Sequence, residues 1–446
     1  MFSPLAGLLP DLADLYQDLH RHPELSFAET RTAVELGHHL RELGYEVAVG
    51  VGRTGVVGVL RNGAGPTVML RADMDALPVT ERTGLPYAST RAGVMHACGH
   101  DLHCAWLVGA AALLAHSGDR WAGTVLVVFQ PAEEVGGGAE AMVDDGLFDR
   151  FGRPDVALGQ HVGPAPAGRV LSRPGLMMAA SDSLRVRLFG RGGHGARPES
   201  TVDPVVMAAS TVLRLQTVVS REVPATEAAV VTVGALHSGT KENIIPDDAE
   251  LKLSVRSFDP RIRELVLAGI ERIVRGEAAA AGAPKPPEIE LERAFAPVVN
   301  DEAATARVSD AFIAHFGADR VVPAPLLTGG EDFGEYSTRG GFPSVFWFVG
   351  GTDPDAYARA EQLGRVDRDI PSNHSPYFAP VLDPTLSTGV ETLVTAALAW
   401  LEVGDGPQAR GTVGERVGTD HGEGRPVGER ARADHGEGDR AGPVGA

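Results

Sequence analysis

The residues best suited to chemistry lie close together, in the stretch His96-Ala-Cys98-Gly-His100-Asp101-Leu-His103. Two adjacent acids follow further along the chain, in Gln130-Pro-Ala-Glu133-Glu134. Thiolate and imidazole groups are good ligands for borderline divalent metals, and carboxylates complete such coordination shells. Cys98 and His100 stand only two positions apart, so the backbone between them must turn or extend for both to reach one centre. The pattern therefore predicts a metal site where a loop enters a helix.

Two other interpretations of this stretch are open. A lone histidine or cysteine is most often a packed core residue, and a thiol paired with a histidine can act as a nucleophile. A Cys–His nucleophile needs only one thiol and one base, which leaves the paired acids and the downstream histidines without a function. The number of metal-ligand side chains in so short a stretch therefore favours a metal site.

The composition is that of a large globular protein with an acidic surface. The chain has 446 residues, of which 43% are hydrophobic and 22% are charged, and this length predicts more than one domain. The net charge of −19 argues against a nucleic-acid partner, because such partners require a basic surface. The two cysteines, Cys98 and Cys104, cannot form a disulfide framework, which fits a reducing compartment.

The apolar segments of the sequence indicate where in the cell the protein is expected to lie. The first residues place aspartates among leucines, as an amphipathic helix does, and they lack the basic and apolar regions of a cleavable signal. No run reaches the ~18 consecutive apolar residues that a membrane-spanning helix needs. We therefore expect a cytoplasmic protein without a membrane partner.

Residues 46–128 alternate short apolar strands with loops and helices. Strands are expected at 56–60, 67–70 and 124–129, and helices beside them at 30–43 and 102–116. Such strands predict an α/β sheet that helices cover on both faces. The chemical groups follow these strands directly, as in sheets whose sites form at the carboxyl ends of the strands.

Residues 181–293 follow a different pattern, with strands near both ends and two long helices. The expected order is β-α-β-β-α-β, with the two middle strands joined by a turn at 243–246. This order is ferredoxin-like, and we expect an α+β domain inserted between two catalytic segments, 1–180 and 294–404. Residues 405–446 contain no Leu, Ile, Phe, Tyr or Trp and repeat short motifs, so we predict a disordered tail.

Taken together, the motifs resemble those of the metal-dependent amidohydrolases that include hippurate hydrolase and the auxin–amino acid conjugate hydrolases, within the aminoacylase and carboxypeptidase superfamily. The resemblance covers about residues 8–402 and adds these motifs to the two above: His20-Arg-His22-Pro-Glu24, Arg71-Ala-Asp73-Met-Asp75, Gly159-Gln-His161, Gly190-Arg-Gly-Gly-His194, Asn243-Ile-Ile-Pro246, Gly330-Glu331-Asp332-Phe333 and Asn373-His374. It implies a zinc-exopeptidase-like mixed sheet flanked by helices, with the inserted domain serving as a lid and for dimerisation.

The resemblance also implies a set of site residues. It implies two divalent ions per subunit, Zn²⁺ or Mn²⁺, with these ligands: Cys98, His100, Glu134, His161 and His374. It implies that Glu133 is the general base and that Asp75 orients a metal ligand. Adjacent acids suit these separate roles only if the backbone between them is irregular, and the glycines at 136–138 make that plausible.

Three residues of the inserted domain resemble groups that act on the substrate. In relatives the counterpart of His194 reaches across a dimer into the partner's site and steadies an oxyanion, so we expect a homodimer. Asn243 and Arg256 resemble groups that hold the substrate's carboxylate, and the planar fork of arginine suits that task. Leu102 stands where this family usually has glycine, and we expect it to narrow the rear of the pocket.

The predicted reaction is hydrolysis of N-acyl-L-amino acids, such as hippurate-like or N-acetyl conjugates, to a carboxylic acid and a free amino acid. Two bound cations would polarise the carbonyl and lower the pKa of a water molecule. A carboxylate would carry that water's proton to the leaving amine. A metallo-exopeptidase or dipeptidase with the same metal centre is the alternative. A third interpretation is a protein that binds metal without catalysing a reaction. Glu133 argues against it, because a protein that only binds metal needs no general base.

Overall fold

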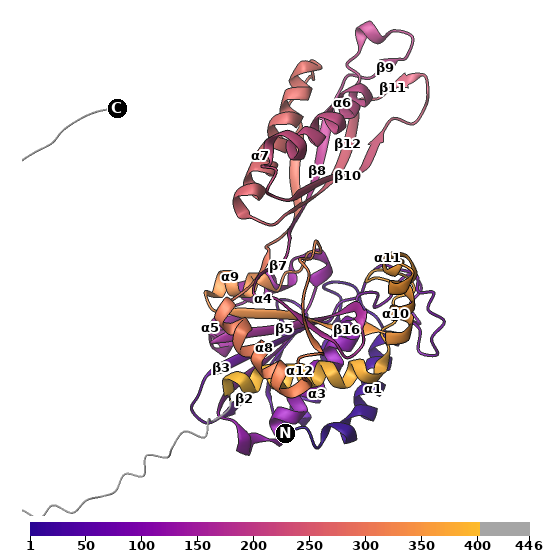
Figure 1. Cartoon of the computed structure of the whole chain (residues 1–446). Coiled ribbons are helices and arrows are strands. Elements are labelled where there is room, and N and C mark those ends of the chain that lie inside the picture. The colour runs from indigo at the N-terminus through magenta and orange to yellow at the C-terminus, as the bar shows by residue number, and fades with distance from the viewer. Residues whose placement is uncertain (402–446) are drawn as a thin grey trace, which may run out of the picture. The chain divides into compact units, whose positions relative to one another are not determined.

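The structure is a computed structural model that describes residues 1–401, so the predicted tail at 405–446 lies outside the described residues. Its largest element is an eight-stranded mixed sheet with helices on both faces (Figure 1). The strand order is β1 (Glu46–Val51), β2 (Gly55–Asn62), β4 (Gly123–Gln130), β3 (Thr67–Asp73), β5 (Val156–Pro166), β16 (Ser344–Thr352), β6 (Val170–Ser172) and β15 (Val321–Pro323). Strand β3 runs parallel to both β4 and β5, whereas β2 is antiparallel to β4. The predicted mixed α/β sheet is confirmed.

Each face of this sheet buries its own hydrophobic cluster, because successive strand side chains point to opposite faces. In β3, Val68 and Leu70 join one cluster, while Met69 between them joins the other. The first cluster is covered by α1 (Leu5–Arg21), α2 (Thr30–Glu42), α3 (His100–His116), α8 (Glu302–Phe316) and α12 (Leu382–Leu401). The second is covered by α4 (Gly138–Asp144), α5 (Leu147–Phe151) and α9 (Gly334–Gly340).

Helix α3, which carries part of the chemical cluster, is buried along most of its length. Its residues from His100 to Leu114 are all buried, as expected of a helix that is apolar on every side. A Cβ at Gly109 would lie 2.7 Å from side-chain atoms of both Leu12 in α1 and Val390 in α12. Glycine at this position therefore lets three helices pack closely behind the site.

The inserted segment forms a separate four-stranded antiparallel sheet in the order β10-β12-β8-β13. Its elements follow the predicted sequence: β8 (Ala180–Phe189), α6 (Pro204–Thr217), β10 (Ala229–Ser238), β12 (Asp248–Ser257), α7 (Pro260–Ala280) and β13 (Glu288–Phe295). This strand order is ferredoxin-like. Both helices begin at an Asp-Pro pair. The side chains of Asp203 and Asp259 accept hydrogen bonds from backbone amides of the first turn and so cap the amino ends. The domain boundaries at residues 181 and 293 stay a prediction.

The segment predicted as a turn at 243–246 has more structure than expected. Two of its residues form β11 (Ile244–Ile245), which pairs with β9 (Gly193–His194). The prediction was wrong because the partner strand lies some fifty positions earlier in the chain, beyond any local pattern. The consequence is that His194 and Asn243 lie on one small ribbon. Among the described residues, no helix has the length and apolar character needed to cross a membrane.

Candidate metal centre

Several of the predicted site residues lie near three neighbouring parallel strands, β4, β3 and β5. Glu133 and Glu134 follow β4, and His161 lies within β5, next to β3 in the sheet. Cys98 precedes α3, and His100 is its first residue. This placement matches the rule that sites in α/β sheets form where the strands end, and the predicted entry from loop to helix is confirmed.

A glycine makes the turn that brings Cys98 and His100 to one centre. Gly99 has φ +89°, in the left-handed region, and a Cβ there would lie 2.4 Å from Val162. Both the backbone conformation and the close approach of β5 therefore exclude other residues.

The two adjacent glutamates point to different surroundings because the backbone around them is irregular. They lie in a short 3₁₀ helix, η2 (Glu133–Val135), between Ala132 with φ 51° and Gly136 with φ 68°. Both flanking values lie in the left-handed region. The expectation of an irregular backbone at this point is confirmed.

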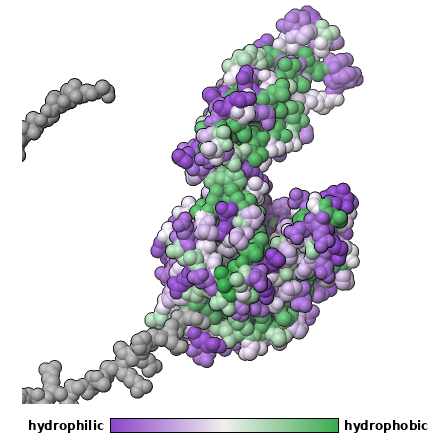
Figure 2. Space-filling model, in the orientation of Figure 1, coloured by the Kyte–Doolittle hydropathy of each residue, from purple (hydrophilic) through white to green (hydrophobic). Residues whose placement is uncertain are grey.

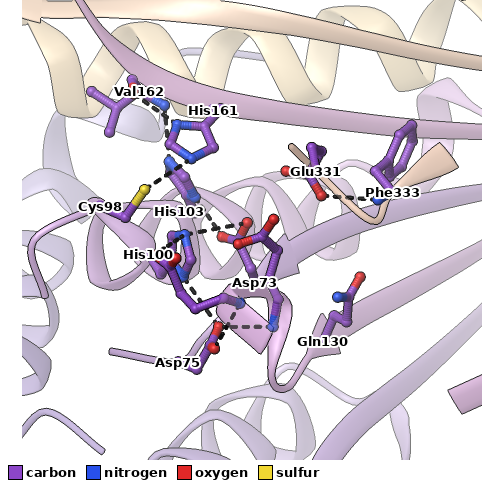
Figure 3. A network of polar contacts seen from close by, with 12 residues as sticks. Asp73, Asp75, Cys98, His100, His103, Gln130, His161, Val162, Glu331 and Phe333 are labelled. Atoms are coloured by element: carbon purple, nitrogen blue, oxygen red, sulfur yellow. Dashed lines mark hydrogen bonds and ion pairs between the residues drawn. The ribbon is translucent and has the colours of Figure 1, made fainter. Parts of the chain in front are cut away.

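Asp75 contacts both the two glutamates and His100. Its carboxylate accepts hydrogen bonds from the backbone amides of Glu133 and Glu134, both at 3.1 Å, and from the Ser26 hydroxyl at 2.6 Å. The same carboxylate lies 3.3 Å from Nδ1 of His100, as Figure 3 shows. This contact leaves Nε2 of His100 near Asp73, at 3.6 Å, and Glu134, at 3.9 Å. That Asp75 orients a metal ligand stays a prediction.

All five predicted ligands come together. Among the described residues, four groups of possible ligand atoms have all their atoms within 4.8 Å of one another, and two of these groups contain Glu134: Cys98 with Glu134 and His374, and His100 with Glu133 and Glu134. The other two are Asp73 with His100, His103 and His161, and Glu133 with Glu331 and Asp332. Glu134 belongs to the first two groups: its carboxylate oxygens lie 3.9 Å from Nε2 of His100 and 3.4 Å from Nε2 of His374. His161 completes the set, with Nε2 3.5 Å from the sulfur of Cys98 (Figure 3).

The donor set fits a pair of divalent cations. Nε2 of His100 and Oε1 of Glu134 are buried and have no hydrogen-bond partner among residues 1–401. Buried polar atoms nearly always have a partner, and a cation between these two atoms would supply one. Thiolate, imidazole and carboxylate groups are all ligands of divalent metals in proteins.

A buried charge network behind the centre was missed in the sequence. The side chain of Arg71 is fully buried and bonds Asp73 at 2.8 Å, Glu331 at 2.8 Å and Asp332 at 3.2 Å. Asp73 in turn lies 2.5 Å from Nδ1 of His103. The signal available in the sequence is an arginine inside an otherwise apolar strand, because a buried cation needs partners.

These carboxylates also set the electrostatics of the candidate base. Burial, followed by the charges of Glu331 and Glu134, raises the pKa of Glu133 well above its usual range. Burial, followed by Glu134 and Glu133, likewise raises the pKa of the Cys98 thiol. The site therefore carries an excess of negative groups that bound cations would stabilise in their ionised form.

The substrate-side residues do not all meet at this centre. Arg256 lines a cavity of about 900 Å³ together with Cys98 and Glu134. His194 and Asn243 do not line it; both are exposed on the β9–β11 ribbon of the same chain. The expectation for Leu102 was wrong. Its side chain is 1% exposed and packs in the hydrophobic cluster beneath the sheet rather than in the cavity wall, because its position on α3 faces the core.

Known proteins show which family this geometry belongs to. The model for peptidase family M20/M25/M40 matches residues 69–397. Hippurate hydrolase of Campylobacter jejuni is 44% identical over 309 residues, which cover 67% of this chain and 79% of that protein. N-acetyl-L-cysteine deacetylase of Bacillus subtilis is 39% identical over 353 residues, 79% of this chain and 82% of that protein.

A solved structure supports the same family assignment. The Bacillus subtilis YXEP protein, described as a dinuclear metal binding peptidase from the M20 family, has a TM-score of 0.70 and 30% identity, covering 88% of this chain and 99% of that one. The resemblance predicted from the motifs is thereby confirmed. The chain belongs to peptidase family M20/M25/M40 and is a hydrolase.

Proposed function

We propose that this hydrolase is a binuclear metal-dependent amidohydrolase that converts N-acyl-L-amino acids to a carboxylic acid and a free amino acid. The observation that carries the proposal is the position of Glu134 in two ligand groups, with Glu133 directly beside it. The names of the hippurate hydrolase and the N-acetyl-L-cysteine deacetylase both describe cleavage of an acylated amino acid.

In this proposal Cys98, His100, Glu134, His161 and His374 would hold two divalent cations. The cations would polarise the amide carbonyl and make water more acidic. The YXEP protein, described as dinuclear, supports the number of ions. The thiolate of Cys98 and the three imidazoles favour Zn²⁺ by their softness, and Mn²⁺ is the other candidate.

Glu133 is the proposed general base. Its carboxylate accepts a proton from the attacking water and returns it to the nitrogen of the leaving amine, without which the amine is a poor leaving group. The hydrogen bond from its backbone amide to Asp75 holds it beside the ligands. A raised pKa fits this role, because the group must both accept and release a proton.

Arg256 is the proposed partner of the substrate's carboxylate within the chain, and His194 and Asn243 would come from a second copy. Three observations support a homodimer. The outer edge of β10 has no neighbouring strand among residues 1–401. Two large apolar residues on α6 are exposed, Val206 at 65% and Leu213 at 74%. Figure 2 shows hydrophobic residues, in green, beside hydrophilic ones on the surface of the inserted domain. His194 is exposed rather than directed into its own chain's cavity.

A metallo-exopeptidase or dipeptidase is the second candidate. It is favoured by the description of the YXEP protein as a peptidase. Both reactions use the same centre, and only the groups around the scissile bond differ. The pocket rather than the metals would therefore distinguish them.

The test has two parts. The protein is first stripped with a chelator until metal analysis finds none, and activity should be lost and then return with Zn²⁺, Mn²⁺ or Co²⁺. The reconstituted enzyme is then assayed with N-acetyl, N-benzoyl and indole-acetyl amino acids beside dipeptides. Full activity in the metal-free protein would overturn the metal mechanism. Hydrolysis of dipeptides alone would replace the proposed reaction by the second candidate.

A further inference from the structure

The open face of the inserted sheet, on the side away from α6 and α7, carries a row of alternating charges. Side chains of β8 reach this face at every second position, which includes Arg185 and Arg187. Arg185 lies 3.6 Å from Glu250 on β12 and also pairs with Glu290 on β13. Arg187 pairs with Asp248. At this end of the face, each arginine therefore has an acidic partner on a neighbouring strand.

The other end of the same face is different. Arg256 on β12 lies opposite Ser181 of β8, and Arg293 on β13 lies opposite Ser183. Neither guanidinium forms a salt bridge or a side-chain hydrogen bond with any residue between 1 and 401. Even Glu292, the residue before Arg293, lies 3.4 Å from Arg185 instead. Two arginines thus remain unpaired on a face where the other two are paired.

This unpaired end is a wall of the metal-site cavity. Ser181, Ser183, Arg256 and Arg293 line that cavity together with Glu133 and Glu134. The strands that carry the two arginines lie on either side of β8, roughly 10 Å apart. The short serine side chains between them leave open space over β8, into which both long side chains can reach.

Each arginine also adjoins a loop of the catalytic centre. A Cβ at Gly136 would lie 3.1 Å from Cγ of Arg293, and Gly136 is two residues beyond Glu134. A Cβ at Gly330 would lie 3.2 Å from Nη1 of Arg256, and Gly330 directly precedes Glu331. The glycines therefore make room for the arginines against the same loops that carry the catalytic and buried carboxylates.

We propose that Arg293 forms, with Arg256, a site for two carboxylates, and that the preferred substrates are N-acyl amino acids that carry both. The proposal rests on the proposed amidohydrolase function and names its substrate class. A single carboxylate can form two hydrogen bonds with the guanidinium group of one arginine, which leaves the guanidinium group of the other arginine unpaired. A dianionic substrate pairs both.

The charge balance supports this assignment. Burial, followed by the charge of Arg293, lowers the pKa of Arg256. The guanidinium groups of Arg256 and Arg293 therefore repel each other, and a substrate with two carboxylates bound between them would relieve that repulsion. The second carboxylate can belong to the amino acid, as in N-acetyl-glutamate, or to the acyl group, as in N-succinyl-methionine.

Calorimetric binding to the metal-loaded Glu133→Gln protein tests the site without turnover. Two ligand pairs separate the two sources: N-acetyl-glutamate against N-acetyl-glutamine, and N-succinyl-methionine against N-butyryl-methionine. In at least one pair the dicarboxylate should bind about 10- to 100-fold more tightly, the usual worth of hydrogen bonds to a charged group. Adding Arg293→Met should bring that ratio close to one, and Arg293→Lys should retain part of it.

Arg185→Met is the matched control, since it removes the same charge from the same face outside the cavity and should leave the ratio at its original value. Equal binding within both pairs, or a preference that survives Arg293→Met, would overturn the proposal. Hydrolysis of the same four compounds by the unaltered enzyme is measured separately. If none is cleaved, the amidohydrolase function fails, while the binding ratios still decide the role of Arg293.

Discussion

Glu133 and Glu134 are chemically identical neighbours that the fold places in different environments. Glu134 lies near the histidines His100 and His374, whereas Glu133, which also lies near His100, is in addition close to the buried acids Glu331 and Asp332. A carboxylate among cation ligands is suited to hold metal, and one among other carboxylates is suited to hold a proton. The proposed division of roles would therefore come from the backbone of η2 rather than from the residues themselves.

Substitution of each glutamate should separate these roles. Glu133→Gln keeps the shape but cannot accept a proton, so kcat should fall by roughly 10²- to 10⁴-fold, with metal content close to that of the original protein. Glu134→Gln should lose bound metal. Steady-state kinetics combined with metal analysis check both. Loss of metal in Glu133→Gln with retention in Glu134→Gln would mean that the roles are reversed.

A second residue-scale prediction concerns pH. Nδ1 of buried His20 lies 2.6 Å from Asp101 and its Nε2 lies 3.3 Å from Glu81. Burial by itself lowers the pKa of His20, but Asp101 and then Glu81 raise it to about 9. Because the folded pKa exceeds the unfolded value of about 6.5, the charged histidine stabilises the fold fully below pH ~6.5. That stability, up to about 3 kcal/mol, is lost as pH rises through about 9.

Thermal melting between pH 6 and pH 10 checks this prediction. The melting temperature of the unaltered protein should fall toward that of His20→Gln as the pH rises through about 9. A constant difference between the two proteins across the whole range would show that His20 does not titrate in this window.

At the scale of elements, the contact between α3 and α12 is the tightest behind the site. A Cβ at Gly389 of α12 would lie 2.1 to 2.3 Å from indole atoms of Trp106 in α3. Trp106 is fully buried and cannot move away. Gly389→Ala should therefore destabilise the protein by about 1–3 kcal/mol, the usual cost of overpacking a core.

Gly276→Ala is the matched control, because Gly276 lies in α7 with nothing within 4 Å of an added Cβ. Alanine is the better helix former, so this change should stabilise by about 0.5–1 kcal/mol. Melting temperatures of the two variants should therefore move in opposite directions. A shift of the same sign in both would show that the Trp106 contact does not limit this position.

At the scale of the whole molecule, the exposed position of His194 leads us to predict that the proposed active site needs a second copy of the chain. Mixing two inactive variants, His194→Ala and Glu133→Gln, under conditions of subunit exchange should restore activity. A hybrid dimer has one site in which an intact Glu133 meets an intact His194 of the other copy.

The control mixture pairs Glu133→Gln with the double variant Glu133→Gln/His194→Ala and should stay inactive. Subunit exchange is verified with differently tagged copies. Proven exchange without recovery of activity would place His194 within its own subunit's site or outside catalysis altogether.

Local patterns in the sequence were sufficient to predict most of the elements. Apolar strands and Asp-Pro helix starts depend on neighbouring residues, so their signals lie within a few positions of the element itself. Cys98, His100 and Glu134 could be proposed as ligands because they occur in short motifs with the right residue types, and their role stays a prediction. The irregular backbone around Glu133 could likewise be predicted from the glycines that follow it.

Tertiary structure decided what depends on distant partners. Arg71 bonds Glu331 across 260 positions of sequence, so an arginine in an apolar strand signals that partners are needed but not which distant residues supply them. Whether Leu102 faced the pocket or the core depended on how α3 packs against the sheet. Arg293 is one of many arginines in the sequence, and only the register of β13 against β8 leaves it unpaired in the cavity wall. Such features follow from long-range packing and strand register, which no window of neighbouring residues specifies.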